Sequence, residues 1–374
     1  MSAHWTVLRY CAQPGIFNRI GRRCLTTQQT RPAPQLYQHQ RALIFPGQGS
    51  QFVGMGMDLN EQFSAARHVF QEADDVLGFH LSRLMFGGDP AELMLTKNAQ
   101  PAIVAVSVAA TRALEDAAGM DASTMYSATM GHSVGEYSAL VAAHAISFAD
   151  ALRLVRVRGK VMQDAVGSRD FAMCACILRR AQVADVVADV EQVQHEIQHM
   201  GAGEVVQVAN INSSSQVVLS GTRTAVDRAI TSLQSKRLAM RAVNLPVSAP
   251  FHCSLMAPAK AVLATCIQDM APIHDSTVWT MPVISNVTGC PHESAATTQT
   301  LLAEQVDSPV LWLQSMQYLK DICGISRWGA MGPGSVVGNL AGKEFTHDIV
   351  RRLSDADAIC KFVAVMGRQL QRGH

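Results

Sequence analysis

The sequence predicts an α/β protein in which a small α+β domain is inserted into a larger α/β domain. Its 374 residues exceed the size of one small domain. Short apolar runs alternate with segments of helical periodicity on both sides of a central stretch. That stretch carries shorter elements in a different order. We therefore assign residues 40–167 and 245–374 to the large domain and residues 168–244 to the small one.

The composition argues against several other classes of protein. Hydrophobic residues make up 48% of the chain and charged residues 16%, which suits a substantial core and disfavours disorder or a coiled coil. The net charge of +1 gives no reason to expect nucleic acid as a partner. No apolar run reaches 18 residues, so we expect no membrane span. The nine cysteines show neither C-x-x-C nor paired Cys/His spacing, so we expect no metal.

The N-terminal segment has a composition of its own. No Asp or Glu occurs between Met1 and Met57. Six arginines fall there, namely Arg9, Arg19, Arg22, Arg23, Arg31 and Arg41. Arginine-rich segments without acidic residues are typical of mitochondrial presequences, although a merely disordered basic tail has the same composition. We expect residues 1–39 to be a mitochondrial transit peptide and the mature chain to reside in the mitochondrial matrix.

The large domain alternates strands with helices. Apolar RALIFPG predicts a buried strand at 41–47 that leads into the loop GQGSQ. Further strands are expected at 125–130, 282–286 and 327–331, the last followed by the loop GPGSVVG and a helix. Helices are expected at 61–77, 99–117, 136–143, 148–163, 298–306 and 310–320. Pro101 would lie in the first turn of its helix, where a missing N–H costs nothing.

The small domain shows the order strand, helix, strand, strand, helix, strand. The predicted elements are 171–178, 183–194, 205–210, 216–220, 223–234 and 238–245, with a tight Asn/Ser turn between the two middle strands. This order is typical of a ferredoxin-like α+β domain.

The stretch GHSVGEYSAL carries the strongest chemical signal. It contains G-x-S-x-G between a predicted strand and a predicted helix. At such a turn the glycines let the helix pass close to the strand, and the serine hydroxyl reaches the helix N-terminus. Ser133 is therefore a candidate nucleophile, and the large domain is expected to be α/β-hydrolase-like. A glycine-rich structural turn is the alternative.

A serine nucleophile needs a base from elsewhere in the fold. His132 is adjacent in sequence, but adjacency does not aim an imidazole at the hydroxyl. His252 stands out in LPVSAPFHCSLM, because it follows the strand leaving the small domain and two prolines stiffen its loop. A packed, non-catalytic histidine is the alternative.

Two other segments could serve the same chemistry. The glycines of GQGSQ allow the backbone to approach a ligand, and its amides could form half of an oxyanion hole. A phosphate-binding or flexible turn is the alternative, although the Lys-Ser/Thr of a P-loop is absent. The helix LRLVRVRGKVMQ offers Arg153, Arg156 and Arg158, one of which could pair with a carboxylate. Periodicity does not choose among them.

Taken together, the motifs carry a family resemblance. FPGQGSQ, GHSVGEYSAL, RVRGKVMQ, PVSAPFHCSLM and GPG occur in this order, and from residue 43 to about residue 340 the chain resembles the malonyl-CoA:acyl carrier protein transacylases. With its arginine-rich start it looks like the mitochondrial member. The resemblance implies an active site in the cleft between the two domains.

The resemblance also implies roles for single residues. Ser133 would take the malonyl group as an ester, and His252 would activate it while a main-chain carbonyl holds the second ring nitrogen. Gln305 lies at the matching position to orient that histidine. The N–H groups of Gln48 and Val134 would form the oxyanion hole, and Arg158 would bind the malonyl carboxylate.

Four further residues are candidate substrate contacts by resemblance, namely Asn210, Asn212, Phe251 and Met162. The ring of Phe251 would crowd a 2-methyl branch and so favour malonyl over methylmalonyl. One methyl group shifts selectivity by only about 1–3 kcal/mol, so some leakage to other acyl groups is expected.

The implied reaction is a ping-pong transfer of malonyl from malonyl-CoA to the phosphopantetheine thiol of an acyl carrier protein, for mitochondrial fatty acid synthesis. It needs no bound cofactor. The carrier would bind transiently to a monomer, with Arg179, Arg180, Lys236 and Arg237 as docking candidates or plain solvated charges. Three readings compete with this one: a hydrolase, an acyltransferase for another acyl group, and a non-enzymatic scaffold.

Overall fold

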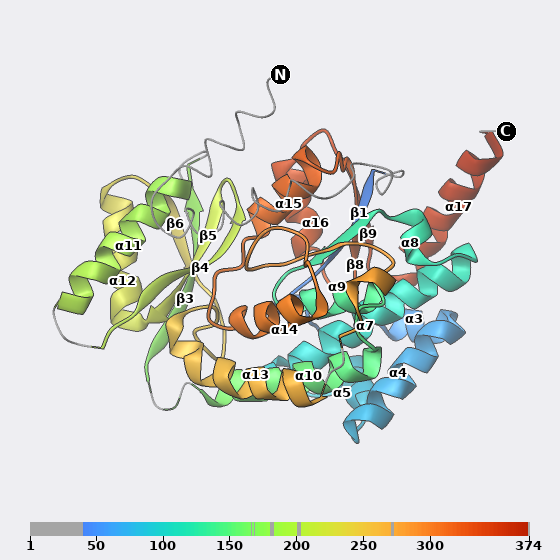
Figure 1. Ribbon diagram of the computed structural model, residues 1–374, viewed down its shortest axis with the longest axis horizontal. Helices are drawn as coiled ribbons and strands as arrows, with labels where there is room; N and C mark the ends of the chain where they lie inside the picture. Colours follow the sequence, from blue (N-terminus) through green and yellow to red (C-terminus); the bar gives the residue numbers. More distant parts are fainter. Residues whose placement is uncertain are drawn as a thin grey trace.

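A computed structural model describes residues 40–372, except 166, 168, 180–182, 200–202 and 271–272. The expected transit peptide at 1–39 and the docking candidate Arg180 lie outside the described residues. In the described part the chain forms a five-stranded sheet and a four-stranded sheet, each with its own helices (Figure 1). No helix in these ranges is both long enough and apolar enough to cross a membrane.

The larger sheet is parallel throughout. Its strand order is β7-β2-β1-β8-β9. The strands are β1 (Arg41–Phe45), β2 (Ala128–Gly131), β7 (Val283–Ile284), β8 (Arg327–Met331) and β9 (Ile349–Leu353). Because carboxyl ends of parallel strands share one edge, the loops after β1, β2 and β7 meet there. These are the loops that begin with Pro46, His132 and Ser285.

Helices cover both faces of this sheet, and alternation along β1 shows why. Leu43 and Phe45 belong to the core shared with the helices at 96–118, 135–142 and 148–164, whereas Ala42 and Ile44 face the core under the helices at 312–321 and 336–344. A strand buried on both faces reads as a continuous apolar run, as RALIF does.

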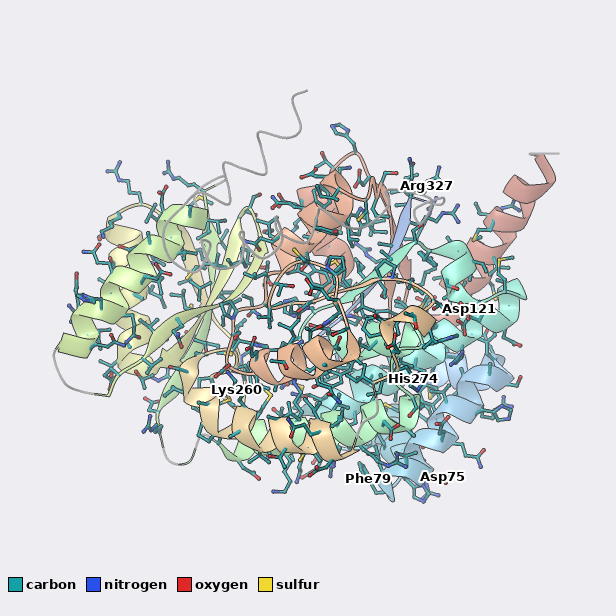
Figure 2. All side chains as sticks on the ribbon, viewed as in Figure 1. Asp75, Phe79, Asp121, Lys260, His274 and Arg327 are labelled. Atoms are coloured by element: carbon teal, nitrogen blue, oxygen red, sulfur yellow. The ribbon has the colours of Figure 1, made fainter. Side chains whose placement is uncertain are left out.

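The helices of the large domain, in chain order, are α3 (Met57–Gln62), α4 (Ser64–Leu77), α5 (Leu81–Gly87), α6 (Pro90–Met94), α7 (Thr96–Ala118), α8 (Ala122–Met125), α9 (Gly135–Ala142), α10 (Phe148–Asp164), η3 (Ser254–Met256), α13 (Ala257–Met270), η4 (Ser276–Val278), α14 (Ala295–Glu304), α15 (Trp312–Asp321), α16 (Val336–Glu344) and α17 (Ala356–Arg372). Lys260 on α13 pairs with Asp307 at 3.1 Å, which ties this helix to the turn after α14 (Figure 2).

The smaller domain lies between α10 and η3 in the chain. It consists of β3 (Phe171–Leu178), α11 (Val183–His199), β4 (Val206–Ser213), β5 (Gln216–Thr222), α12 (Arg223–Ser235) and β6 (Ala239–Asn244). Its sheet is antiparallel in the order β4-β5-β3-β6, and α11 and α12 share its apolar core. The predicted order of a ferredoxin-like unit is therefore found in the structure.

The prediction for Pro101 is wrong. Helix α7 begins at Thr96, so Pro101 lies in the second turn, where its missing N–H leaves the Lys97 carbonyl without a helical donor. Arg156 on α10 supplies the replacement, because its Nη1 donates to Lys97 O at 2.6 Å. The same guanidinium lies 4.8 Å from the centre of the Phe79 ring. Arg156 is thus a structural residue.

Other differences from the predicted elements have local causes. Residues 122–125 form the short helix α8, because the Asp121 side chain accepts from Ser123 N at 2.8 Å, and the following strand starts only at Ala128. The helix expected at 61–77 is divided by Phe63, whose backbone is extended. No separate element is predicted from the sequence at the positions of α5, α6, α13, β9 and α17.

Candidate active site

Ser133 lies in a tight turn between β2 and α9 that only glycine permits on either side. A Cβ atom on Gly131 would lie 1.9 Å from the carbonyl carbon of Gly135, and one on Gly135 would lie 2.6 Å from Pro46 O. Ser133 itself has a φ of 51°, in the left-handed region that side chains disfavour. Its hydroxyl is half-buried at the N-terminus of α9, which begins at Gly135. The motif thus folds as a nucleophile elbow.

His252 meets this hydroxyl from the other end of the inserted domain. Its Nε2 lies 2.8 Å from Ser133 Oγ, and its Nδ1 donates to the main-chain oxygen of Gln305 at 2.8 Å. A carbonyl only accepts, so Nδ1 carries the ring proton and Nε2 is free to accept from the serine. The two residues therefore have the geometry of a base and nucleophile pair in which a main-chain carbonyl, rather than a carboxylate, accepts from the histidine.

The imidazole is held in its neutral form. Burial and, to a smaller extent, the nearby Arg158 charge lower the pKa of His252 to about 3, although the hydrogen bond to Gln305 opposes both effects. Only 4% of His252 is exposed. A neutral imidazole is what a general base requires at physiological pH.

Arg158 is the arginine of α10 that reaches the serine. Its Nη2 donates to Ser133 Oγ at 3.1 Å and to Gln305 Oε1 at 2.8 Å. Its side chain is almost fully buried, and within the described residues its Nε has no acceptor. Arg153, by contrast, pairs with Asp150 at the surface. A buried donor without a partner costs about 1–3 kcal/mol, so Arg158 is suited to an anionic ligand.

The backbone N–H groups around Ser133 differ in whether they have a hydrogen-bond acceptor. Ser133 N donates to Asn286 Oδ1 at 2.7 Å. For the N–H groups of Gln48 and Val134, no acceptor is present in the described part of the chain. The Gln48 loop lies against the elbow, because a Cβ on Gly47 would meet His132 O at 2.5 Å. Two uncommitted amides therefore lie on the two loops that flank Ser133.

Comparison with known proteins shows where this site belongs. The acyl transferase domain family matches residues 42–317. A malonyl CoA-acyl carrier protein transacylase from Bacillus subtilis (strain 168) is 42% identical over 302 residues, which cover 81% of this chain and 89% of that protein. The transacylase of Escherichia coli (strain K12) is 38% identical over 302 residues, with 80% and 91% covered. The chain belongs to the malonyl-CoA:acyl carrier protein transacylase family.

Solved structures agree with this placement of the transacylase. The acyl-carrier-protein-S-malonyltransferase from Bartonella henselae has a TM-score of 0.79 at 37% identity, over 87% of this chain and 99% of that one. A malonyl-transacylase in complex with a type II PKS acyl-carrier protein has a TM-score of 0.78 at 34% identity, with 87% and 99% covered. The predicted fold class and the assignment as an acyltransferase are confirmed.

The four weaker candidates lie in different settings in this transacylase. Asn212 Oδ1 is 2.9 Å from His132 Nε2, which directs the His132 ring away from Ser133 Oγ and towards the small domain. Asn210 forms an isolated bridge with Val310, and no side-chain hydrogen bond is found for it within the described ranges. Phe251 and Met162 are buried hydrophobic residues, with exposures of 6% and 1%.

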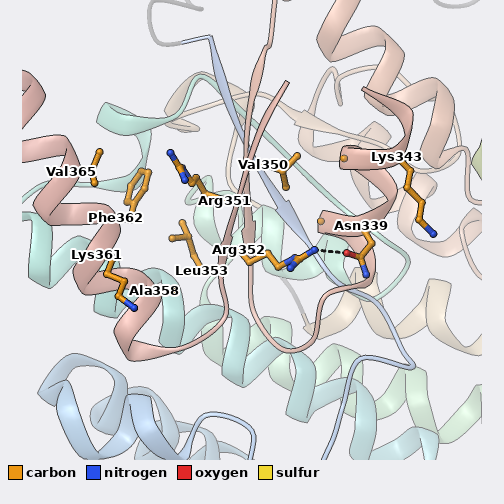
Figure 3. Close-up of a pocket in the computed structure, with 12 residues that line it drawn as sticks. Asn339, Lys343, Val350, Arg351, Arg352, Leu353, Ala358, Lys361, Phe362 and Val365 are labelled. Carbon is orange, nitrogen blue, oxygen red and sulfur yellow. Dashed lines mark hydrogen bonds between the residues drawn. The ribbon is translucent and has the colours of Figure 1, made fainter. Parts of the chain in front are cut away.

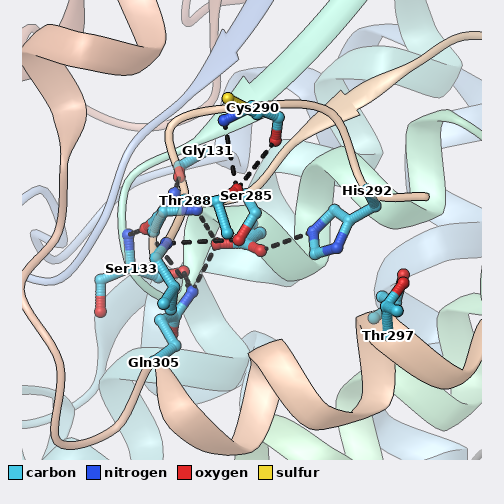
Figure 4. Close-up of polar contacts among 12 residues, drawn as sticks. Gly131, Ser133, Ser285, Thr288, Cys290, His292, Thr297 and Gln305 are labelled. Carbon is cyan, nitrogen blue, oxygen red and sulfur yellow. Dashed lines mark hydrogen bonds and ion pairs between the residues drawn. The ribbon is translucent and has the colours of Figure 1, made fainter. Parts of the chain in front are cut away.

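Sequence reasoning missed the polar residues behind the elbow. Asn286, Glu136 and His292 are buried and connected to one another and to Gln305 by hydrogen bonds (Figure 4). One signal was available, because Glu136 is a charged residue in a helix that is otherwise apolar or small, EYSALVAA. Asn286 and His292 carried none, since their partners lie about 150 residues away.

The metal-binding potential of the chain and its main cavity can both be located relative to this site. Among the described residues, no group of three or more His, Cys, Asp or Glu side chains could hold a metal ion. A cavity of about 620 Å³ lies elsewhere, between α16, β9 and α17 (Figure 3). There Arg352 Nη2 donates to Asn339 Oδ1 at 2.6 Å. Ser133, His252 and Arg158 do not line it.

Proposed function

We propose that this transacylase moves a malonyl group from malonyl-CoA to the phosphopantetheine thiol of an acyl carrier protein through an ester on Ser133. The observation that carries the proposal is the buried Arg158 guanidinium, 3.1 Å from Ser133 Oγ and with an uncommitted Nε. An acyl group with a free carboxylate satisfies that cation, whereas a plain acyl group leaves it buried and unpaired. Relatives that carry the malonyl transacylase name support this choice.

Acylation begins when Ser133 Oγ attacks the thioester carbonyl of malonyl-CoA. His252 Nε2 takes the hydroxyl proton, and the Gln305 carbonyl stabilises the imidazolium through Nδ1–H. The amides of Gln48 and Val134 receive the tetrahedral oxyanion, and losing one such donor costs about 10²–10³ in rate. Collapse expels coenzyme A as a thiolate, which takes the proton from His252 and leaves the malonyl ester.

The second half reverses these steps with another thiol. His252 deprotonates the phosphopantetheine thiol of the carrier, and the thiolate attacks the Ser133 ester. Collapse expels the Ser133 oxygen, which takes the proton back from His252, and malonyl leaves as a thioester on the carrier. Arg158 keeps the malonyl carboxylate in place through both halves. No bound cofactor takes part, and Phe251 beside the base favours malonyl over a branched analogue.

The carrier protein is proposed as a transient partner of a monomer. A related malonyl-transacylase has been solved in complex with an acyl-carrier protein. Arg179, Lys236 and Arg237 are exposed on the small domain and could attract an acidic carrier, although Lys236 already pairs with Asp189. We expect charge reversal at Arg179 and Arg237 to slow malonyl transfer to the carrier protein while acylation of Ser133 by malonyl-CoA stays unchanged. This result would support a docking role for the surface. Light scattering gives the oligomeric state.

Exchange of Arg158 tests the proposal most sharply. We expect Arg158→Ala to lower kcat/KM for malonyl transfer to a holo carrier protein by about 30- to 1000-fold, because a buried charge pair is lost. Transfer of acetyl from acetyl-CoA should change far less. Arg153→Ala is the matched control, since that arginine lies at the surface of the same helix. Equal losses for both acyl groups would contradict the role of the carboxylate.

The arginine-rich start supports a mitochondrial location, where the enzyme would supply malonyl groups for fatty acid synthesis in the matrix. We expect the full chain, expressed with a C-terminal tag, to be imported by isolated mitochondria and shortened near residue 40. A chain that starts at Gln40 should stay outside. Import of both forms, or of neither, would contradict a transit peptide at 1–39.

A further inference from the structure

A buried carboxylate lies behind the nucleophile, outside the proposed steps. Glu136 is the second residue of α9, three positions after Ser133, and it is fully buried. Its Oε2 accepts from Asn286 N at 3.0 Å and from Gln305 Nε2 at 2.7 Å. Its Oε1 accepts from His292 Nε2 at 2.8 Å (Figure 4). Three donors on one carboxyl group fit an ionised carboxylate, which only accepts.

This carboxylate determines which way the Gln305 amide points. Gln305 has a donating nitrogen and an accepting oxygen at the end of one side chain. The nitrogen faces Glu136, which can only accept, and the oxygen faces Arg158 Nη2 at 2.8 Å, which can only donate. Both neighbours select the same orientation. The amide is therefore a polar spacer between a buried anion and a buried cation.

Because Gln305 separates Glu136 from Arg158, the guanidinium remains available to a substrate carboxylate. If Glu136 contacted Arg158 directly, a bidentate pair would occupy the guanidinium and exclude a substrate carboxylate. With Gln305 in between, the Glu136 charge still opposes the effect of burial, which lowers the pKa of Arg158. Nη2 is directed to Ser133, and Nε keeps no acceptor within the described residues.

His292 holds the far side of the carboxylate. Its side chain is inaccessible to solvent, its backbone N–H donates to Val283 O at 2.9 Å, and its ring lies edge-on to Trp279 at 6.2 Å. With Oε1 bound to His292, only Oε2 remains to face Asn286 and Gln305. His292 thus fixes the rotation of the carboxyl group.

We propose that Glu136, held by His292, is a positioning residue that orients the Gln305 amide and so keeps Arg158 aimed at Ser133 and free for a substrate carboxylate. The inference rests on the proposed malonyl transfer. It predicts that Glu136 and His292 set the preference for carboxylated over plain acyl groups although neither residue contacts the substrate.

The test compares Ser133 acylation by malonyl-CoA and acetyl-CoA in the absence of carrier protein, followed by intact mass. In Glu136→Gln one of the two accepting oxygens becomes a donating nitrogen, so either the contact with His292 or the contacts with Asn286 and Gln305 are lost. The negative charge that holds the Gln305 amide is lost as well. We expect kcat/KM for malonyl-CoA to fall by about 10- to 100-fold. The value for acetyl-CoA should fall much less, so that the malonyl preference collapses.

Two histidine variants keep the test decisive if Glu136→Gln fails to fold. His292→Leu removes the donor to Oε1 and should lower the malonyl preference by about 3- to 10-fold. His292→Gln keeps a donor at a similar position and should retain the preference. Asp189→Asn is the matched control, because Asp189 is also buried and paired, with Lys236, but lies in the small domain. It should leave the preference unchanged.

The outcomes separate the two claims. A folded Glu136→Gln or His292→Leu variant that loses both acyl substrates equally would show a merely structural role and overturn the inference. Unchanged preference in these variants would overturn it as well. Failure of the wild-type enzyme to form a malonyl ester would instead overturn the proposed function, and this inference with it.

Discussion

At the scale of single residues, the site combines backbone strain with a neutral base. Ser133 and His252 have φ values of 51° and 61°, and such conformations cost on the order of 1–3 kcal/mol each. The surrounding contacts hold both residues in place, so that Oγ and Nε2 meet at 2.8 Å. Arg158 Nη2 lies 3.1 Å from the same hydroxyl oxygen, and its positive charge favours negative charge there.

The pH dependence of acylation follows from the state of His252. The reaction needs a neutral imidazole, and burial lowers the pKa of His252 to about 3, against an ordinary value near 6.5. Protonation therefore sets in only at acid pH. We expect the rate of Ser133 acylation by malonyl-CoA to stay flat from about pH 8 to about pH 5.

Single-turnover rates across this range would check the profile, with circular dichroism at each pH to show that the protein stays folded. A rate that halves near pH 6.5 in the folded protein would mean that His252 titrates like a solvent-exposed histidine. The base would then have to be far less buried than its 4% exposure indicates.

At the scale of elements, close packing of α10 against α7 places Arg158. Gly159, its neighbour on α10, has no room for a side chain, because a Cβ there would lie 2.6 Å from Thr96 O. Thr96 also accepts from Gln48 Nε2 at 3.1 Å. The start of α7 therefore packs against α10 next to Arg158 and also contacts the loop that carries the Gln48 amide.

Alanine substitutions at two helical glycines should change the stability of the protein in opposite directions. Gly159→Ala should destabilise the protein by about 1–3 kcal/mol and slow acylation, because α10 must move away from α7. Gly342→Ala on α16 should stabilise it by about 0.5–1 kcal/mol, since its Cβ would only touch Val350 Cγ2 at 3.8 Å. Urea unfolding measures both. Similar effects of the two substitutions would contradict the packing argument.

Elements with strong periodicity could be predicted from the sequence, and elements fixed by single contacts could not. The apolar run of β1 and the strand and helix order of the small domain follow from local pattern. The short helix α8 depends on one Asp121 cap, and the unexpected start of α7 depends on Arg156 satisfying a carbonyl. Such single side-chain interactions produce no recognisable pattern in the local sequence.

At the scale of the whole molecule, the inserted domain separates the two halves of the site in sequence. Ser133 and Arg158 precede it and His252 follows it, yet Ser133 Oγ lies 2.8 Å from His252 Nε2 and 3.1 Å from Arg158 Nη2. The small domain is fastened to the large one through Val310, whose N and O bond to Ala209 and Ile211 at 2.8 and 2.9 Å.

This distance along the chain explains how much of the site the sequence could reveal. Ser133 was visible in its motif and His252 in its proline-stiffened loop, whereas Arg158 and Gln305 needed a family resemblance to single them out. Periodicity could not choose among the three arginines of α10. The contact between Glu136 and His292 could not be predicted from the sequence, because the two residues are 156 positions apart.

The measurement that tests the central claim most directly is the intact mass of the protein from residue 40 onwards after incubation with malonyl-CoA alone. We expect one malonyl adduct that maps to Ser133, is absent in Ser133→Ala and is discharged by an added pantetheine thiol. Steady release of free coenzyme A without an adduct would indicate a hydrolase. Neither adduct nor release would indicate a non-enzymatic scaffold and contradict the account.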